Sequence, residues 1–176
     1  MNEATLRMVL HLTARMTFVV FVGAYIGNAL RDLWPGVFSA WLARRRDWFI
    51  VGIAASHTLH LAAIVAYYQV VGWSHLRFLR VLPGGLTYLV IYALAVAAIL
   101  RLSGRKEAFY RTGSGSESFV LNLIWFVFAS AFVPRIVSGW PAYSFFGVLA
   151  LVALTIRIAG RVRHPQTMAT SGQVPR

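Results

Sequence analysis

Five long apolar runs fill most of this 176-residue chain, and no other feature constrains its fold as strongly. They cover approximately residues 8–30, 48–71, 82–102, 118–134 and 141–159. A hydrocarbon core about 30 Å thick needs about 20 helical residues to cross it, and every backbone polar group inside lipid needs a partner within the protein. The alternating polarity of a membrane β-strand is absent. The sequence therefore predicts an all-α integral membrane helical bundle with about five transmembrane helices.

The domain organisation is predicted to be simple. Residues 1–163 should form the bundle, and the polar segment 164–176, with its prolines and glycine, should be a disordered cytoplasmic tail. The N-terminus lacks the pattern of a cleaved signal, so the first helix is expected to be retained. No glycine-rich nucleotide motif is found, so no flavin or nicotinamide domain is expected in this chain. Zero cysteines exclude disulfides, thiolate metal sites and cysteine catalysis.

The basic charge is divided unequally between the two ends of the predicted helices. The formal net charge is +12. One side holds Arg31, Arg44, Arg45, Arg46, Arg101, Arg105, Lys106, Arg111, Arg157, Arg161, Arg163 and Arg176. The other side holds Arg7, Arg15, Arg77, Arg80 and Arg135. The positive-inside rule predicts an outer N-terminus and a cytoplasmic C-terminus. Anionic lipid head groups account for the basic loops, so no nucleic-acid partner is expected.

Two histidines interrupt the second apolar run. A rise of 1.5 Å per residue from Trp48 puts His57 and His60 about 14 and 18 Å deep, and their i, i+3 spacing puts them on nearly one face. Ionisable groups inside a membrane are candidates for function, and imidazole is an axial ligand of heme iron. The pair predicts either a cofactor site in which His60 and His57 are metal ligands, or hydrogen bonds between helices that only support packing.

A basic doublet, Arg45-Arg46, precedes this run, which then contains a glycine and the pair Leu59-His60. With these motifs the segment 44–61 resembles the ferric reductase-like transmembrane domain family. The similarity spans roughly residues 17–160 and includes 82–88 and 123–135. Members such as the heme-binding membrane subunit of periplasmic methionine sulfoxide reductase pass electrons through b-type heme. The resemblance implies heme b, with His60 as an axial ligand and His57 as the next candidate, in a bacterial inner (cytoplasmic) membrane.

The chain departs from the family at the second axial ligand. Members carry another Leu-His pair at the start of the helix that corresponds to the fourth run. Here that position falls near Ser116-Glu117-Ser118, and no histidine occurs between His75 and His164. Bis-histidine ligation as the family uses it is therefore impossible. The alternatives are a ligand from His11 in the first run, five-coordinate iron or a ligand from a partner subunit, and loss of heme with retention of the fold.

Two classes of function follow. In the first, the chain is the membrane electron-transfer subunit of an oxidoreductase, with no catalytic residue of its own, and carries electrons between a quinone or flavoprotein and a separate redox protein. In the second, it is a heme-free structural or assembly membrane subunit that retains the fold. The lipid bilayer is a partner in both. An ion-coupled transporter is disfavoured because no acidic residue is expected deep in a helix, and Glu117 is predicted to be solvated in a loop.

Overall fold

The chain folds into a bundle of long helices. The computed structural model describes residues 2–73, 78–104, 115–137 and 141–163, and side chains at 78–83 and 142 are left aside. The helices are α1 (Glu3–Leu33), α2 (Val37–Arg44), α3 (Arg46–Val71), α4 (Phe78–Leu102), α5 (Gly115–Phe132), the 3₁₀ helix η2 (Val133–Ile136) and α6 (Pro141–Arg163). Five of the described helices are long and apolar enough to cross a membrane. The predicted all-α architecture is confirmed, whereas the predicted tail 164–176 lies outside the described residues.

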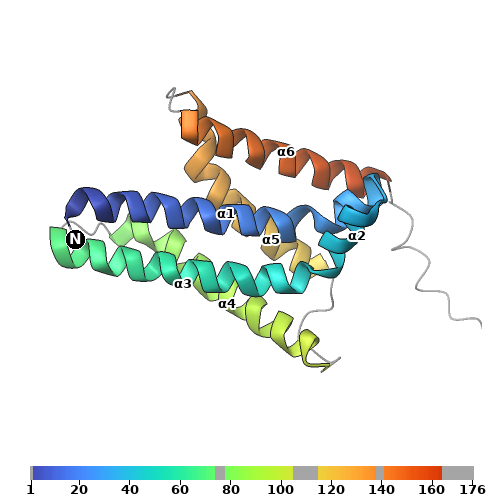
Figure 1. Cartoon of the computed structure of the whole chain (residues 1–176), viewed down its shortest axis with the longest axis horizontal. Coiled ribbons are helices and arrows are strands. Elements are labelled where there is room, and N and C mark those ends of the chain that lie inside the picture. Colours follow the sequence, from blue (N-terminus) through green and yellow to red (C-terminus); the bar gives the residue numbers. More distant parts are fainter. Residues whose placement is uncertain (1, 74–77, 105–114, 138–140, 164–176) are drawn as a thin grey trace, which may run out of the picture.

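Helix α1 forms the middle of the bundle (Figure 1). It packs against α3 on one side and α6 on the other, while α4 packs against α3 and α5 packs against α4 and α6. The short helix α2 lies at the end of the bundle where the chain passes from α1 to α3. Helix α1 is thus the element through which the two halves of the bundle meet.

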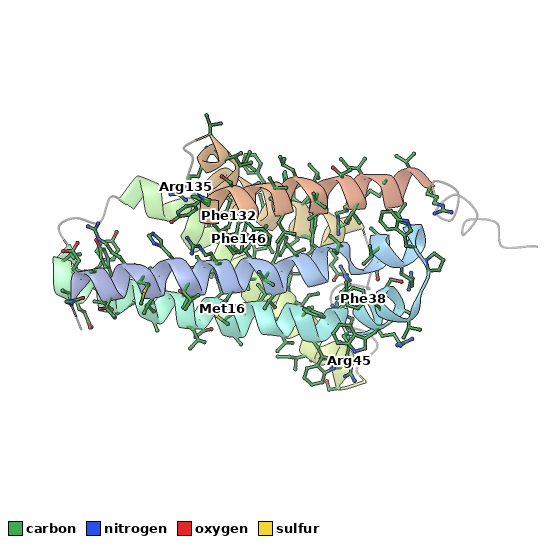
Figure 2. All side chains as sticks on the ribbon, turned by 45° about the horizontal axis from the view of Figure 1, so that its top comes forward. Met16, Phe38, Arg45, Phe132, Arg135 and Phe146 are labelled. Atoms are coloured by element: carbon green, nitrogen blue, oxygen red, sulfur yellow. The ribbon has the colours of Figure 1, made fainter. Side chains whose placement is uncertain are left out.

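The core is built from aromatic side chains on facing helices. On α1, buried residues recur at helical spacing, as Phe18 and Phe21 show. The Phe18 ring centroid lies 5.3 Å from that of Phe128 and 5.1 Å from that of Phe132. Phe132 and Phe146, whose centroids are 5.6 Å apart, lie between α6 and α1 (Figure 2). These contacts join α1, α5 and α6 into one apolar core.

The outer surface is apolar too. Leu89 and Phe126 are 68% and 64% exposed, and they belong to a large set of exposed aliphatic and aromatic side chains on the long helices. A water-soluble protein seldom exposes so much contiguous apolar surface, whereas lipid tails solvate it well. The distribution supports an integral membrane protein with the bilayer around its helices.

The region between the first two spans is more ordered than the sequence predicted. Residues 37–44 form α2 in place of a loop, Arg31 lies in the last turn of α1, and Arg46 is the first residue of α3. Ser39 stabilises this turn, because its side-chain oxygen accepts from Gly36 N–H at 3.0 Å and its hydroxyl lies 2.7 Å from Trp34 O. Local hydrogen bonding of this kind leaves little periodic signal in a sequence.

The approach of α6 to α1 generates a prediction about Gly160. A Cβ at Gly160 would lie 2.8 Å from Ala29 Cβ and 3.0 Å from Ala29 Cα, so Gly160→Ala must push the two helices apart. We expect a loss of about 1–3 kcal/mol, as for other overpacked sites. Gly85→Ala is the matched control, since nothing lies within 4 Å of its added Cβ, and it should leave stability unchanged or raise it. Thermal unfolding in detergent measures both, and equal effects would contradict the close packing.

Candidate functional site

The two predicted histidines lie together near the middle of α3. Their ring centroids are 5.8 Å apart. His57 is only 8% exposed and faces the interior, while His60 is half-buried. The expected juxtaposition of the two imidazoles within a membrane-spanning helix is therefore present in the structure.

His60 is held by a threonine of α1. Its Nδ1 lies 2.8 Å from Thr13 Oγ1, which also lies 2.9 Å from Val9 O, one helical turn back. A threonine hydroxyl has one proton, and in a helix it commonly donates to the carbonyl four residues earlier. We therefore assign His60 Nδ1–H as the donor to Thr13. This tautomer leaves Nε2 of His60 with a free lone pair, the arrangement typical of metal-binding histidines.

His57 has a different environment. Its ring packs against Tyr88 of α4, with centroids 4.0 Å apart, and against Phe128 of α5 at 6.4 Å. Its Nδ1 is buried and has no hydrogen-bond partner among the described residues, and the same holds for the Tyr88 hydroxyl oxygen. Unsatisfied buried polar atoms are rare because each costs about 1–3 kcal/mol. His57 is therefore a polar group that packing alone does not satisfy.

The third candidate, His11, is not brought to this pair. It is exposed on α1 and its ring lies edge-on to Tyr143 of α6, with centroids 6.0 Å apart. Thr13, two residues further along, faces α3 and His60. Residues two apart on a helix point in nearly opposite directions. His11 therefore lies on the side of α1 that faces α6, whereas His60 contacts the opposite side of α1.

The histidine pair offers few ligands for a metal ion. Within the described ranges, no cluster of three or more His, Cys, Asp or Glu side chains could hold a metal ion, so a metal held by protein ligands alone has no support there. One imidazole with a free Nε2 and a bonded Nδ1 is a suitable axial ligand, and His60 meets that requirement. His57 Nδ1 is enclosed by protein atoms, so ligation through it would require its neighbours to move. His60 is the better match.

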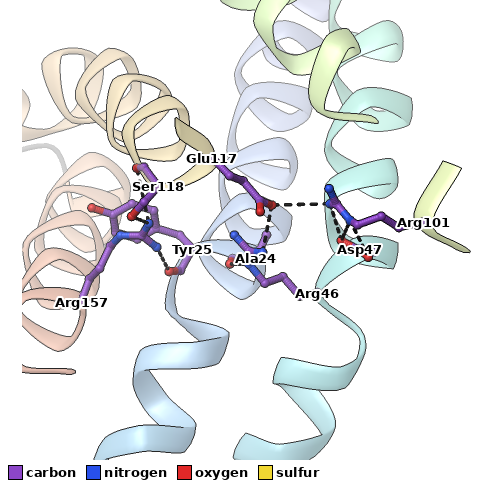
Figure 3. A network of polar contacts seen from close by, with 8 residues as sticks. All are labelled: Ala24, Tyr25, Arg46, Asp47, Arg101, Glu117, Ser118 and Arg157. Carbon is purple, nitrogen blue, oxygen red and sulfur yellow. Dashed lines mark hydrogen bonds and ion pairs between the residues drawn. The ribbon is translucent and has the colours of Figure 1, made fainter. Parts of the chain in front are cut away.

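A second polar site, at the end of the bundle near α2, was not predicted (Figure 3). Arg46 Nη1 of α3 pairs with Glu117 Oε1 of α5 at 2.9 Å, and the two side chains are 5% and 0% exposed. Arg101 of α4 pairs with Asp47 at 2.6 Å and reaches Glu117 Oε1 at 3.5 Å. Arg46 Nε also donates to Ala24 O of α1 at 3.3 Å. We call these four charged residues the inner network, and it joins four helices.

The prediction that Glu117 is solvated in a loop is wrong. Glu117 lies in the first turn of α5 and is completely buried. Arg46 and Arg101, counted as basic residues flanking the spans, are its partners. The sequence did contain a sign of this pairing. It has only five acidic residues, and two of them, Asp47 and Glu117, lie in the segments that carry most of the arginines. Sequence spacing did not show that these charges meet.

A neighbouring cluster involves Arg157, which the structure places inside α6 and buries. Its Nη1 donates to Tyr25 O at 2.5 Å, and its guanidinium lies over the Tyr25 ring, 4.3 Å from the centroid. The Tyr25 hydroxyl donates to Asn122 Oδ1 of α5 at 3.0 Å. Tyr25 thus links α1 to both α5 and α6 beside the inner network.

Comparisons of the chain with known protein families, curated proteins and solved structures found no match. The assignment of function therefore depends on the residues and contacts described above.

The burial of Glu117 generates a prediction about stability. Glu117→Gln keeps the shape but leaves Arg46 buried without its counter-charge, and breaking a buried pair in this way costs about 3–5 kcal/mol. Glu3→Gln is the control, because it removes a carboxylate from the exposed pair with Arg7 and should change stability little. Unfolding in detergent compares the two.

The double variant Arg46→Gln/Glu117→Gln adds a second criterion. Partners in contact are not independent, so its loss of stability should be smaller than the sum of the single losses. Additive losses would show that the two side chains do not form a pair.

Proposed function

We propose that this chain is a membrane electron-transfer subunit that holds a b-type heme through His60. The observation that carries the proposal is the contact between His60 Nδ1 and Thr13 Oγ1, which directs Nε2 of a membrane-buried imidazole away from its hydrogen-bond partner and leaves it free for iron. The resemblance of the segment 44–61 to ferric reductase-like membrane domains points to the same ligand. His57, with its unsatisfied Nδ1, is the second candidate ligand or a hydrogen-bond partner of the site.

The residues of the chain have distinct parts in this proposal. His60 would hold the heme iron through Nε2, and Thr13 fixes the tautomer and ring orientation of this imidazole. The rings of Tyr88 and Phe128 exclude water from the neighbouring His57. A b-type heme, when bound, supplies a one-electron carrier within the membrane. Because His60 is the well-placed histidine of the pair, it would hold the heme alone or together with a partner subunit.

The proposed setting is a bacterial inner membrane with the N-terminus outside and the C-terminus in the cytoplasm. Arginine is more abundant at the end of the bundle that holds α2 and the C-terminal end of α6 than at the opposite end, and this difference supports the orientation. Electrons would pass between a quinone or flavoprotein and a separate redox protein that holds the catalytic cofactor, because no flavin or nicotinamide motif occurs in the sequence.

A heme-free structural or assembly subunit is the second candidate, and a specific observation favours it. Near the sequence position at which the resembling family has its second histidine, this chain has Glu117, which pairs with Arg46. A buried ion pair between α3 and α5 links two helices that a shared cofactor links in the family. In this interpretation, His57 and His60 serve packing alone.

The absorption spectrum of the purified protein separates the two candidates. We expect a Soret band that shifts on reduction with dithionite, binds carbon monoxide in the reduced form, and is lost in His60→Ala. His11→Ala is the matched control and should keep the band, because His11 faces α6. Thr13→Val should still bind heme but with an affinity lowered by about tenfold or more, the usual effect of removing a partner of a ligating histidine. A colourless protein, expressed with excess heme and in its natural host, would exclude the redox function.

The proposed orientation is tested with single cysteines, since the chain has none of its own. Ala4→Cys near the start of α1 should react with a membrane-impermeant maleimide added to intact spheroplasts. Ser103→Cys, exposed after the end of α4, should react only after the membrane is permeabilised. The reverse labelling pattern would invert the topology.

A further inference from the structure

Two guanidinium groups of α6 converge on one hydroxyl of α5. Arg157 Nη2 donates to Ser118 Oγ at 2.9 Å, and Arg161 Nη2 donates to the same oxygen. The two arginines are four residues apart, so they face the same way, and like charges at this spacing repel. Arg157 has further partners in Tyr25 O, Ser118 O and the Tyr25 ring, but all of them are formally neutral.

The charge of this cluster has no acidic partner. Arg157 is only 9% exposed, and its Nε is enclosed and has no hydrogen-bond partner among the described residues. Among the residues that the structure describes, no carboxylate lies within ion-pair distance of Arg157 or Arg161; Glu117, next to Ser118 in the sequence, pairs with Arg46 and reaches Arg101. Neutral partners compensate a buried charge less well than an anion does, so an anion from outside the chain would stabilise this arrangement.

We propose that Arg157, Arg161 and Ser118 bind a phosphate group at this end of the bundle. Guanidinium groups present paired N–H donors that match phosphate oxygens, and those of the exposed Arg161 can reach a ligand, with the Ser118 hydroxyl as one more donor. Arg157, whose terminal nitrogens donate to Tyr25 and Ser118, adds buried positive charge behind them. Ser118 also lies in the first turn of α5, where the helix dipole is positive and favours an anion. The site is independent of the histidine pair, and thus of the proposed heme.

The position of the site suggests two sources of the phosphate. Arg161 is exposed and lies in the last turn of a membrane-spanning helix, at the depth of lipid head groups. The phosphodiester of an anionic phospholipid is one source, and free inorganic phosphate is the other. Both have the same oxyanion chemistry, so the experiment uses both as probes.

The test compares Arg161→Gln with Arg163→Gln in detergent micelles. Arg161 is exposed, and its hydrogen bond within the described part of the chain goes to Ser118, so its variant should fold. Arg163 donates instead to Leu33 O and provides a matched loss of charge. Phosphatidylglycerol and, separately, inorganic phosphate are titrated while the unfolding temperature is recorded. Ser118→Ala is a second variant that retains both charges.

We expect phosphatidylglycerol to raise the unfolding temperature of the parent chain, with half-saturation about tenfold weaker in Arg161→Gln and unchanged in Arg163→Gln. Ser118→Ala should weaken it less. Inorganic phosphate could instead stabilise the chain with the same pattern across the variants, while the lipid adds no further stabilisation. That result would support the site and identify free phosphate as its ligand. No stabilisation by either probe, or equal losses in Arg161→Gln and Arg163→Gln, would overturn the proposal.

Discussion

The buried ion pair between Arg46 and Glu117 is the constraint on which the arrangement of the helices depends. Two charges that are 5% and 0% exposed are tolerated only when they meet at close distance, and these meet at 2.9 Å. The pair fixes the start of α3 against the start of α5, and Arg101 adds the end of α4. Because α3 is a continuous helix from Arg46, this contact also sets the depth of His57, eleven residues or about 16 Å further along.

The bundle could be predicted from the sequence because lipid leaves so few choices. Runs of about 20 apolar residues imply helices whatever their neighbours are, and all five were found. The histidine pair was found by the same reasoning, since its residues are expensive in lipid. Its partners were not, because Thr13 and Tyr88 lie on other helices and resemble any other residue of an apolar run. Glu117 was misplaced because its pairing is determined by contacts about 70 residues apart in sequence.

The two ends of the bundle accommodate arginine in different ways. At the end near α2, carboxylates neutralise Arg46 and Arg101. At the opposite end, Arg15 and Arg135 each lie 5.0 Å from the centroid of the Tyr143 ring. Aromatic faces attract cations without supplying a formal negative charge. Two carboxylates of the described residues, Asp47 and Glu117, thus lie at the end where the arginines are most numerous. They do not neutralise every arginine there, and Arg157 and Arg161 are two cations of that end that converge on one neutral side chain, Ser118.

The inner network also separates folding from cofactor binding. In the family that the sequence resembles, a heme lies between two histidine-bearing helices and helps to hold them together. Here α3 and α5 are already joined by Arg46 and Glu117, and α3 packs directly against α1. A heme at His60 would therefore add an electron carrier to a bundle whose helices have other connections. Replacement of His60 leaves the Arg46–Glu117 pair and the packing of α1 against α3 in place, so a loss of heme in such a variant would report on the ligand and not on the fold.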